Sequence, residues 1–208
     1  KICLDGTFKY VHNGLENGGD LTDEFTYILT DGICNVDVGV IINITPVNDC
    51  PVGTDDTYTV DEDETITTTA AQGVILGAAF IPLAPPATWT KTVGAADTDP
   101  DIGGMNTLTV TLQNAPTQAT SLTCPTIGDP RKNDASPVIC TDGSFSYDHN
   151  GSENNDSFTY FLNDNGAGCV NQGPYTVTIL INGLNDCPVA VPVIGGVAYT
   201  VNEGETRT

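Results

Sequence analysis

The sequence predicts an all-β protein built from β-sandwich modules, and three observations support this class. Short segments are rich in β-branched and aromatic residues, and apolar and polar residues often alternate along them. Asp-Gly pairs at 5–6 and 142–143 mark tight turns between such segments. No segment keeps a helical hydrophobic period, and the 22 Gly, 13 Pro and single Met among 208 residues disfavour a helical protein.

Five expected strands lie between residues 57 and 181. They span residues 57–60, 108–112, 144–147, 157–162 and 175–181. About seven such short strands, separated by turns, are typical of a β-sandwich. A module of this length buries an adequate core without help, so we expect its cysteines to reinforce loops and ends.

The chain also repeats itself. The segment DGTFKYVHNG at 5–14 returns as DGSFSYDHNG at 142–151, and NDCPV at 48–52 returns at 185–189. The period is 185 − 48 = 137 residues, which is the size of one ordinary domain. We therefore expect 1–49 to be the C-terminal part of a first module, 50–186 a complete module, and 187–208 the N-terminal strand region of a third. The whole is expected to be a piece of a longer tandem array.

The charge excludes several partners. Six Lys and Arg stand against 27 Asp and Glu, giving a net charge of 6 − 27 = −21. Nucleic acid and anionic membrane surfaces both need a basic face, so neither is an expected partner. No apolar run is long enough to span a membrane, so no membrane insertion is expected in this segment. The 39% hydrophobic content still predicts a folded chain rather than an acidic disordered tail.

Nothing in the sequence indicates an enzyme. No nucleophile elbow, phosphate-binding loop or zinc-protease motif is present. His12 and His149 occupy equivalent places in two copies of one turn. We interpret both as turn residues that bond to the backbone, because a catalytic base would be needed at one position only.

The ordered set of motifs resembles the cadherin-like and bacterial Ig-like tandem repeats of large surface adhesins and of extracellular matrix or filament proteins. The resemblance is carried by DTDPD at 97–101, LTVT at 108–111, DGSFSY at 142–147, DSFTY at 156–160, VTILI at 177–181 and NDCPV at 185–189. It implies Greek-key sandwiches joined head to tail, with Ca²⁺ at the junctions. Two segments depart from the pattern, namely 124–140, which is inserted before a turn, and 78–92, which is long and apolar.

Calcium ligands are expected among the acids of the turns and linkers. Ca²⁺ prefers carboxylate and carbonyl oxygens, and alternate Asp residues in the 97–101 loop let several carboxylates converge. The resemblance places this loop beside the linker that enters the module, and the glutamate after the first strand beside the linker that leaves it. The upper junction would then use Asn48, Asp49, Asp97 and Asp99. The lower junction would use Glu62, Asn185 and Asp186. The weaker candidates are Asp55, Asp56, Asp101 and Asp164.

The seven cysteines fit four per module if the chain is out of phase with its modules. Cys124 and Cys140 bracket the inserted segment, and closing a loop of ~15 residues stabilises by ~3 kcal/mol in the chain-entropy picture. Cys50–Cys169 is the second expected pair, because both residues lie at the upper end of the module. The alternative, Cys140–Cys169 with Cys3–Cys34, stays open.

The function that these features predict is structural. We expect a repeat segment of an extracellular filament, sheath or adhesin stalk, with neighbouring copies as partners. The alternative is an adhesin binding module whose long loops, 78–92 or 125–139, meet a glycan or protein receptor. Trp89 is expected to anchor the core. Asn43, Asn150 and Asn155 begin N-glycosylation acceptor patterns.

Overall fold

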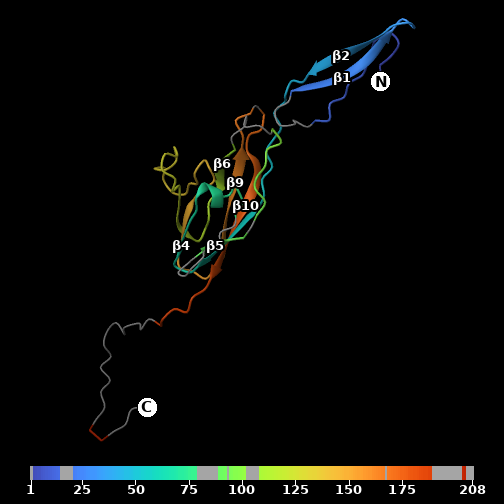
Figure 1. Cartoon of the computed structure of the whole chain (residues 1–208). Helices are drawn as coiled ribbons and strands as arrows, with labels where there is room; N and C mark the ends of the chain where they lie inside the picture. Colours follow the sequence, from blue (N-terminus) through green and yellow to red (C-terminus); the bar gives the residue numbers. More distant parts are fainter. Residues whose placement is uncertain are drawn as a thin grey trace.

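The computed structural model describes residues 2–14, 21–78, 89–92, 94–101, 108–166, 168–188 and 203–204. This part of the chain is all β, with ten strands and one short 3₁₀ turn, η1 (Ala70–Gln72). A two-stranded hairpin lies beyond one end of a larger two-sheet body, as Figure 1 shows. The all-β class predicted from the sequence is therefore confirmed.

The two-sheet body has the layers of a β-sandwich. Its five-stranded sheet has the order β5-β3-β10-β9-β6, in which β3 and β10 pair in parallel and the other neighbours are antiparallel. Its three-stranded sheet has the order β4-β8-β7 and is antiparallel. The strands are β3 (Asp56–Asp61), β4 (Thr65–Thr67), β5 (Trp89–Lys91), β6 (Thr109–Asn114), β7 (Ala119–Thr123), β8 (Ser146–His149), β9 (Asp156–Asn163) and β10 (Gln172–Asn182).

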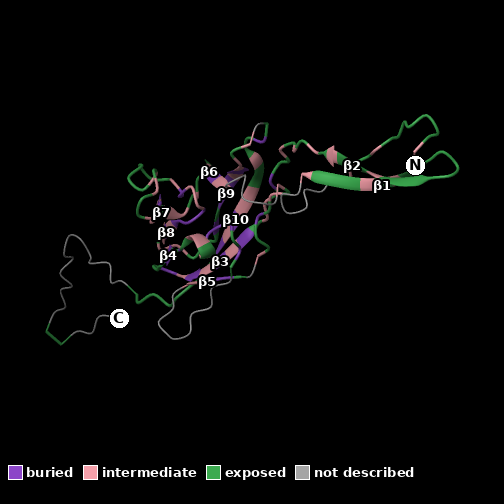
Figure 2. Cartoon of the chain, turned by 45° about the horizontal axis from the view of Figure 1, so that its top comes forward, coloured by how far each residue is buried: buried purple, intermediate pink, exposed green. Residues whose placement is uncertain are grey.

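One hydrophobic core lies between the two sheets. Alternate residues of β3 and β9 are buried, as expected when one face of a strand meets the core. Phe145 stands at the centre, with edge-to-face contacts to Tyr58 at 5.1 Å and to Phe158 at 5.2 Å between ring centroids. Trp89 is half-buried and packs against this core, 6.3 Å from the Tyr58 ring. Figure 2 shows the buried residues concentrated in this body, and no residue of β1 or β2 is buried.

The hairpin consists of β1 (Thr22–Thr30) and β2 (Asn35–Asn43). It matches the register of β9 and β10 up to the irregularity between Gln172 and Tyr175, since Phe25 pairs with Val40 just as Phe158 pairs with Val177. The 137-residue period relates Val40 to Val177. The repeat found in the sequence is thus a repeat of strand register.

The turn before the hairpin also repeats the geometry of the second copy. The Phe8 and Phe25 rings meet edge to face at 5.2 Å, as Phe145 and Phe158 do. The environments differ, because Phe8 is 45% exposed whereas Phe145 is fully buried. In the described residues, the first copy therefore has the local contacts of the module without the opposite half of the core.

The expected strands lie at or close to strands of the structure, but three short strands were not predicted. The predicted segments 57–60, 157–162 and 175–181 lie within β3, β9 and β10, and 108–112 overlaps β6. The segment 144–147 was placed two residues early, because Ser144 belongs to a turn in which its backbone N–H and hydroxyl donate to Asp142. Strands β4, β5 and β7 were not predicted, since three to five residues give too little alternation to recognise.

Candidate metal-binding junctions

The upper junction lies where the linker after the hairpin meets two loops of the sandwich. The Asp49 backbone N–H donates to Asp101 Oδ2 at 3.0 Å. The Asn48 side-chain amide donates to Asp164 Oδ2 at 3.1 Å and contacts Cys169 Sγ at 3.2 Å. Residues of the linker, of the aspartate-rich loop and of the β9–β10 loop therefore meet at this end.

Asp97 is turned into the body of the module. Its carboxylate accepts hydrogen bonds from Thr54 N–H at 2.8 Å and from the Tyr160 hydroxyl at 3.1 Å. Burial raises the pKa of Asp97 to about 6, against the lowering effect of these donors. Asp99 Oδ1 accepts the Asp101 backbone N–H at 2.9 Å, which shapes the loop that carries both carboxylates.

The donor chemistry of the upper junction fits a hard cation, since its side chains offer carboxylate and amide oxygens. In the described part of the chain, the one group of three Asp, Glu, His or Cys ligand atoms within 4.8 Å of one another is Cys124, Asp129 and Cys140. The two cysteines of this group form a disulfide with each other, so the group is not a metal site. Coordination at the junction would require its carboxylates to draw closer than they lie here.

The lower junction lies at the other end of β3 and β10. Glu62 is buried, and its Oε2 accepts the Leu184 backbone N–H at 3.0 Å, which ties the departing linker to the first strand. Asn185 and Asp186 are exposed. The Asn185 amide donates to the Asp186 carbonyl at 3.4 Å, as the Asn48 amide does to the Asp49 carbonyl at 3.3 Å. The two linkers therefore share one local conformation.

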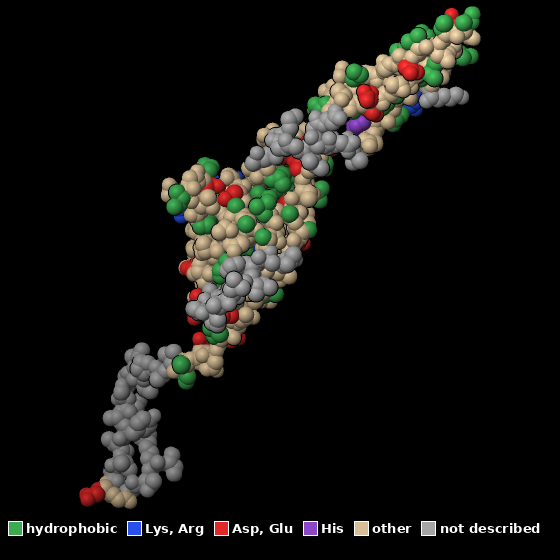
Figure 3. Space-filling view, viewed as in Figure 1, with side chains coloured by type: hydrophobic (Ala, Val, Ile, Leu, Met, Phe, Trp, Pro, Cys, Tyr) green, Lys and Arg blue, Asp and Glu red, His purple; other side chains and the backbone are tan. Residues whose placement is uncertain are grey.

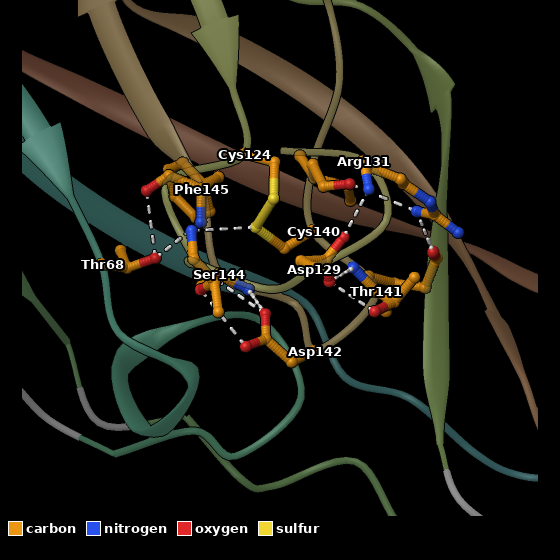
Figure 4. Close-up of a disulfide and its surroundings, with 12 residues drawn as sticks. Thr68, Cys124, Asp129, Arg131, Cys140, Thr141, Asp142, Ser144 and Phe145 are labelled. Atoms are coloured by element: carbon orange, nitrogen blue, oxygen red, sulfur yellow. Dashed lines mark hydrogen bonds between the residues drawn. A yellow bond between two sulfur atoms is a disulfide. The ribbon is translucent and has the colours of Figure 1, made fainter. Parts of the chain in front are cut away.

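Two disulfides close the module, and they are the pairs that the sequence analysis placed first. Cys50–Cys169 joins the entering linker to the β9–β10 loop, with 5.1 Å between Cα atoms and a sequence separation of 119. Cys124–Cys140 closes the base of the inserted segment, with 4.7 Å between Cα atoms. Both cysteines of this second pair are buried, and Figure 4 shows their disulfide and its surroundings. Cys3, Cys34 and Cys187 are exposed and form no disulfide in the described residues.

The inserted segment 125–139 is held down along its length. Asp129 accepts the Thr141 backbone N–H at 2.8 Å and the Arg131 backbone N–H at 2.8 Å. The Arg131 guanidinium reaches the carbonyl oxygens of Val110 and Ile139 (Figure 4). Partial burial raises the pKa of Asp129, but the hydrogen bonds from Thr141 and Arg131 outweigh it and hold that pKa below its ordinary value. The segment is thus a fixed part of the module's side.

The remaining candidates occupy ordinary structural positions. His12 Nδ1 accepts the Gly14 backbone N–H at 3.3 Å, as expected for a turn residue. The same expectation is wrong for His149, which ends strand β8, is buried against Tyr147, and has no hydrogen-bond partner for either ring nitrogen in the described residues. Asp55 accepts the Thr176 backbone N–H at 2.7 Å. The three acceptor asparagines, Asn43, Asn150 and Asn155, are all exposed, and Asn43 is the last residue of β2. Most of the 78–92 loop lies outside the described residues.

Charge is distributed as the composition implies. Figure 3 shows acidic side chains scattered along the visible face, with few Lys or Arg among them. In the described residues, no helix is long and apolar enough to cross a membrane.

Comparisons with protein-family models, with curated proteins and with solved structures found no match. The fold and the site therefore define the class on their own. The chain is an all-β protein whose sheets stack as in a β-sandwich and whose loops are joined by two disulfides.

Proposed function

We propose that the chain is a structural segment of an extracellular tandem array, such as a filament, sheath or adhesin stalk. The observation that carries this proposal is the repeated contact set of the two copies. In each copy a tyrosine hydroxyl bonds to an aspartate at 2.9 Å and an imidazole stacks on the same tyrosine, at matching sequence positions. A repeated unit of this size is typical of load-bearing arrays rather than of enzymes.

The exposed face of the first copy supports the same proposal. Residues of the hairpin and of the preceding turn line an open apolar hollow, namely Ile2, Leu4, Phe8, Phe25, Tyr27, Leu29 and Val40. The equivalents of Phe8, Phe25 and Val40 in the complete module are fully or almost fully buried under β3 and the second sheet. An apolar face of this kind is stabilised when a further half-module covers it.

Calcium is the proposed cofactor at the junctions. At the upper junction the linker already contacts Asp101 and Asp164, so an ion held there would bind the linker and both loops of the sandwich at once. Clustered carboxylates repel one another, and a divalent ion removes that repulsion. The result would be a stiff angle between neighbouring modules. At the lower junction, Glu62, Asn185 and Asp186 would form the half of an equivalent site that this chain supplies.

The disulfides agree with an extracellular setting, because oxidising compartments are where such bonds persist. Cys34 and Cys187 occupy the positions of Cys169 and Cys50 in neighbouring copies. By this equivalence we expect each to pair inside its own module of the array, as Cys50 and Cys169 do. The Cys50–Cys169 bond lies beside the proposed ion, so it would keep the linker on the sandwich even when the ion leaves.

The alternative function, a binding module for a glycan or receptor, has less support. The fixed 125–139 segment is closed by a disulfide and by the Arg131 contacts, so it lacks the freedom of an adaptable binding loop.

Thermal unfolding in Ca²⁺ and in EDTA tests the proposal. Differential scanning calorimetry should give a higher melting temperature in millimolar Ca²⁺ than in EDTA, with Mg²⁺ much less effective because it prefers a smaller and more regular site. Equal melting temperatures in all three conditions would contradict the proposal that the junctions bind Ca²⁺.

A further inference from the structure

A lysine and an aspartate are buried together inside the complete module. The Lys91 and Asp56 side chains are both 0% exposed, and Lys91 Nζ lies 2.9 Å from Asp56 Oδ1. They come from the neighbouring strands β5 and β3, where Lys91 pairs in register with Tyr58. Among the described residues this is the one salt bridge, and neither proposed junction uses it.

The surroundings hold the two groups in contact and exclude water. Lys91 Nζ donates to the Gly73 carbonyl at 2.5 Å and lies 5.1 Å from the centroid of the Tyr58 ring. Asp56 Oδ2 has no hydrogen-bond donor within the described residues. Gly94 covers the carboxyl closely, because a Cβ at that position would lie 3.3 Å from Asp56 Oδ1. The Gly73 carbonyl thus fixes the Lys91 amine in place, beside the Asp56 carboxyl.

Burial makes it costly to keep the Asp56 carboxyl charged. Taking two opposite charges out of water costs several kcal/mol per ion, and the pair recovers this only when all its hydrogen bonds are made. Burial raises the pKa of Asp56 to about 6, although Lys91 lowers it. A neutral carboxylic acid beside a neutral amine is the pair that condenses to an amide, whereas the two ions do not react.

We propose that Lys91 and Asp56 are joined by an isopeptide bond in the mature protein. The Lys91 Nζ lone pair attacks Asp56 Cγ, a C–N bond forms, and one C–O bond breaks. The departing hydroxyl takes a proton from the nitrogen, so the products are an amide and one water molecule. The reaction is a condensation, so no oxidant, reductant or cofactor is needed.

Proximity lowers the barrier that keeps free amines and acids in water from condensing. Groups held in contact react as if at effective concentrations of about 10⁵–10⁸ M. The dry core also removes the solvation that stabilises the two ions in water and releases the product water. The bond would tie the three-residue edge strand β5 to β3 covalently, at the place where the sheet is shortest.

Intact-mass spectrometry of the full chain, denatured and with its disulfides reduced, tests this proposal. The expected mass is that of the sequence minus one water molecule. Tryptic digestion should leave Lys91 uncleaved and give one internally cross-linked peptide, residues 10–131, that is one water lighter than its sequence. A second digestion with a glutamate-specific protease, which cuts after Glu62 or Glu64, should then leave the segment containing Asp56 joined to the segment containing Lys91. A mass equal to the sequence, with normal cleavage after Lys91, would overturn the proposal and leave an ordinary buried ion pair.

Three variants make the result specific, and all are measured under denaturing conditions. Lys91→Arg should restore the full sequence mass, because guanidinium does not condense with the acid. Asp56→Asn should lose ammonia in place of water. Asp55→Asn is the matched control, since the neighbouring Asp55 side chain accepts the Thr176 N–H of β10 and makes no ion pair with Lys91 in the described residues, and this variant should still lose water. Loss of water in Lys91→Arg would place the modification elsewhere and would also contradict the proposal.

Discussion

The Tyr147 hydroxyl donates to Asp156 Oδ2 at 2.9 Å, and in the first copy the Tyr10 hydroxyl donates to Asp23 Oδ2 at the same distance. In the complete module Asp156 also accepts the backbone N–H groups of Thr117 and Gln118, each at 2.9 Å. One carboxylate thereby fixes the turn before β7 to the start of β9 and to the core face of β8.

Replacing this carboxylate should destabilise the module strongly. Asp156→Ala leaves three backbone donors, those of Thr117, Gln118 and Ser157, and one buried hydroxyl without their acceptor, so we expect a loss of more than about 3 kcal/mol in the free energy of unfolding. Urea denaturation measures the change. Asp148→Ala is the control, because Asp148 receives one exposed hydrogen bond from Thr65, and it should cost less than about 1 kcal/mol. Equal losses in the two variants would contradict the role given to Asp156.

The two disulfides should differ in what they contribute. Removing Cys50–Cys169 with a pair of Ser substitutions opens the longer loop, so we expect a loss of about 4–5 kcal/mol, against about 3 kcal/mol for Cys124–Cys140. Guanidinium denaturation of each double variant checks this order. Cys187→Ser removes an exposed cysteine that forms no disulfide in the described residues, and it should leave stability unchanged. A larger loss from the shorter loop would mean that packing, rather than chain entropy, decides the outcome.

The calcium proposal predicts which carboxylates control the response to the ion. Asp101→Asn removes a negative charge beside the linker, so the rise in melting temperature on adding Ca²⁺ should fall by more than half. Asp134→Asn, in the exposed inserted segment, should leave the rise unchanged. Calorimetry in Ca²⁺ and in EDTA gives both values. An identical response in the two variants would show that any bound ion lies elsewhere.

The buried Asp97 should give the module a defined pH dependence in EDTA. Its pKa is raised from 3.8 to about 6, so the folded state binds the proton more tightly than the unfolded state. The stability that this group contributes is fully present below pH 3.8 and is lost as the pH rises through about 6. Denaturation midpoints should therefore fall more steeply between pH 4 and pH 7 in the native chain than in Asp97→Asn. Parallel curves would exclude Asp97 as the group responsible.

The sequence was most informative where a feature recurs or alternates. In long strands such as β9 and β10, apolar and polar residues alternate clearly, so these strands could be predicted. Cys124 and Cys140 bracket a short insertion, so their disulfide could be predicted too. The buried Lys91–Asp56 pair was missed, since neither residue has a repeated counterpart in the sequence and Asp56 was taken as a weak metal candidate. The inward turn of Asp97 was also invisible, because it depends on Tyr160, which lies 63 residues away along the chain.

Small-angle X-ray scattering of the whole chain, in millimolar Ca²⁺ and then in excess EDTA, tests the central claim most directly. A calcium-stiffened junction predicts that the distribution of interatomic distances broadens and changes shape when the ion is removed, because the hairpin copy then samples many angles to the sandwich. Restoring Ca²⁺ should restore the first curve. Superimposable curves in the two solutions would contradict the claim that calcium sets the angle between modules.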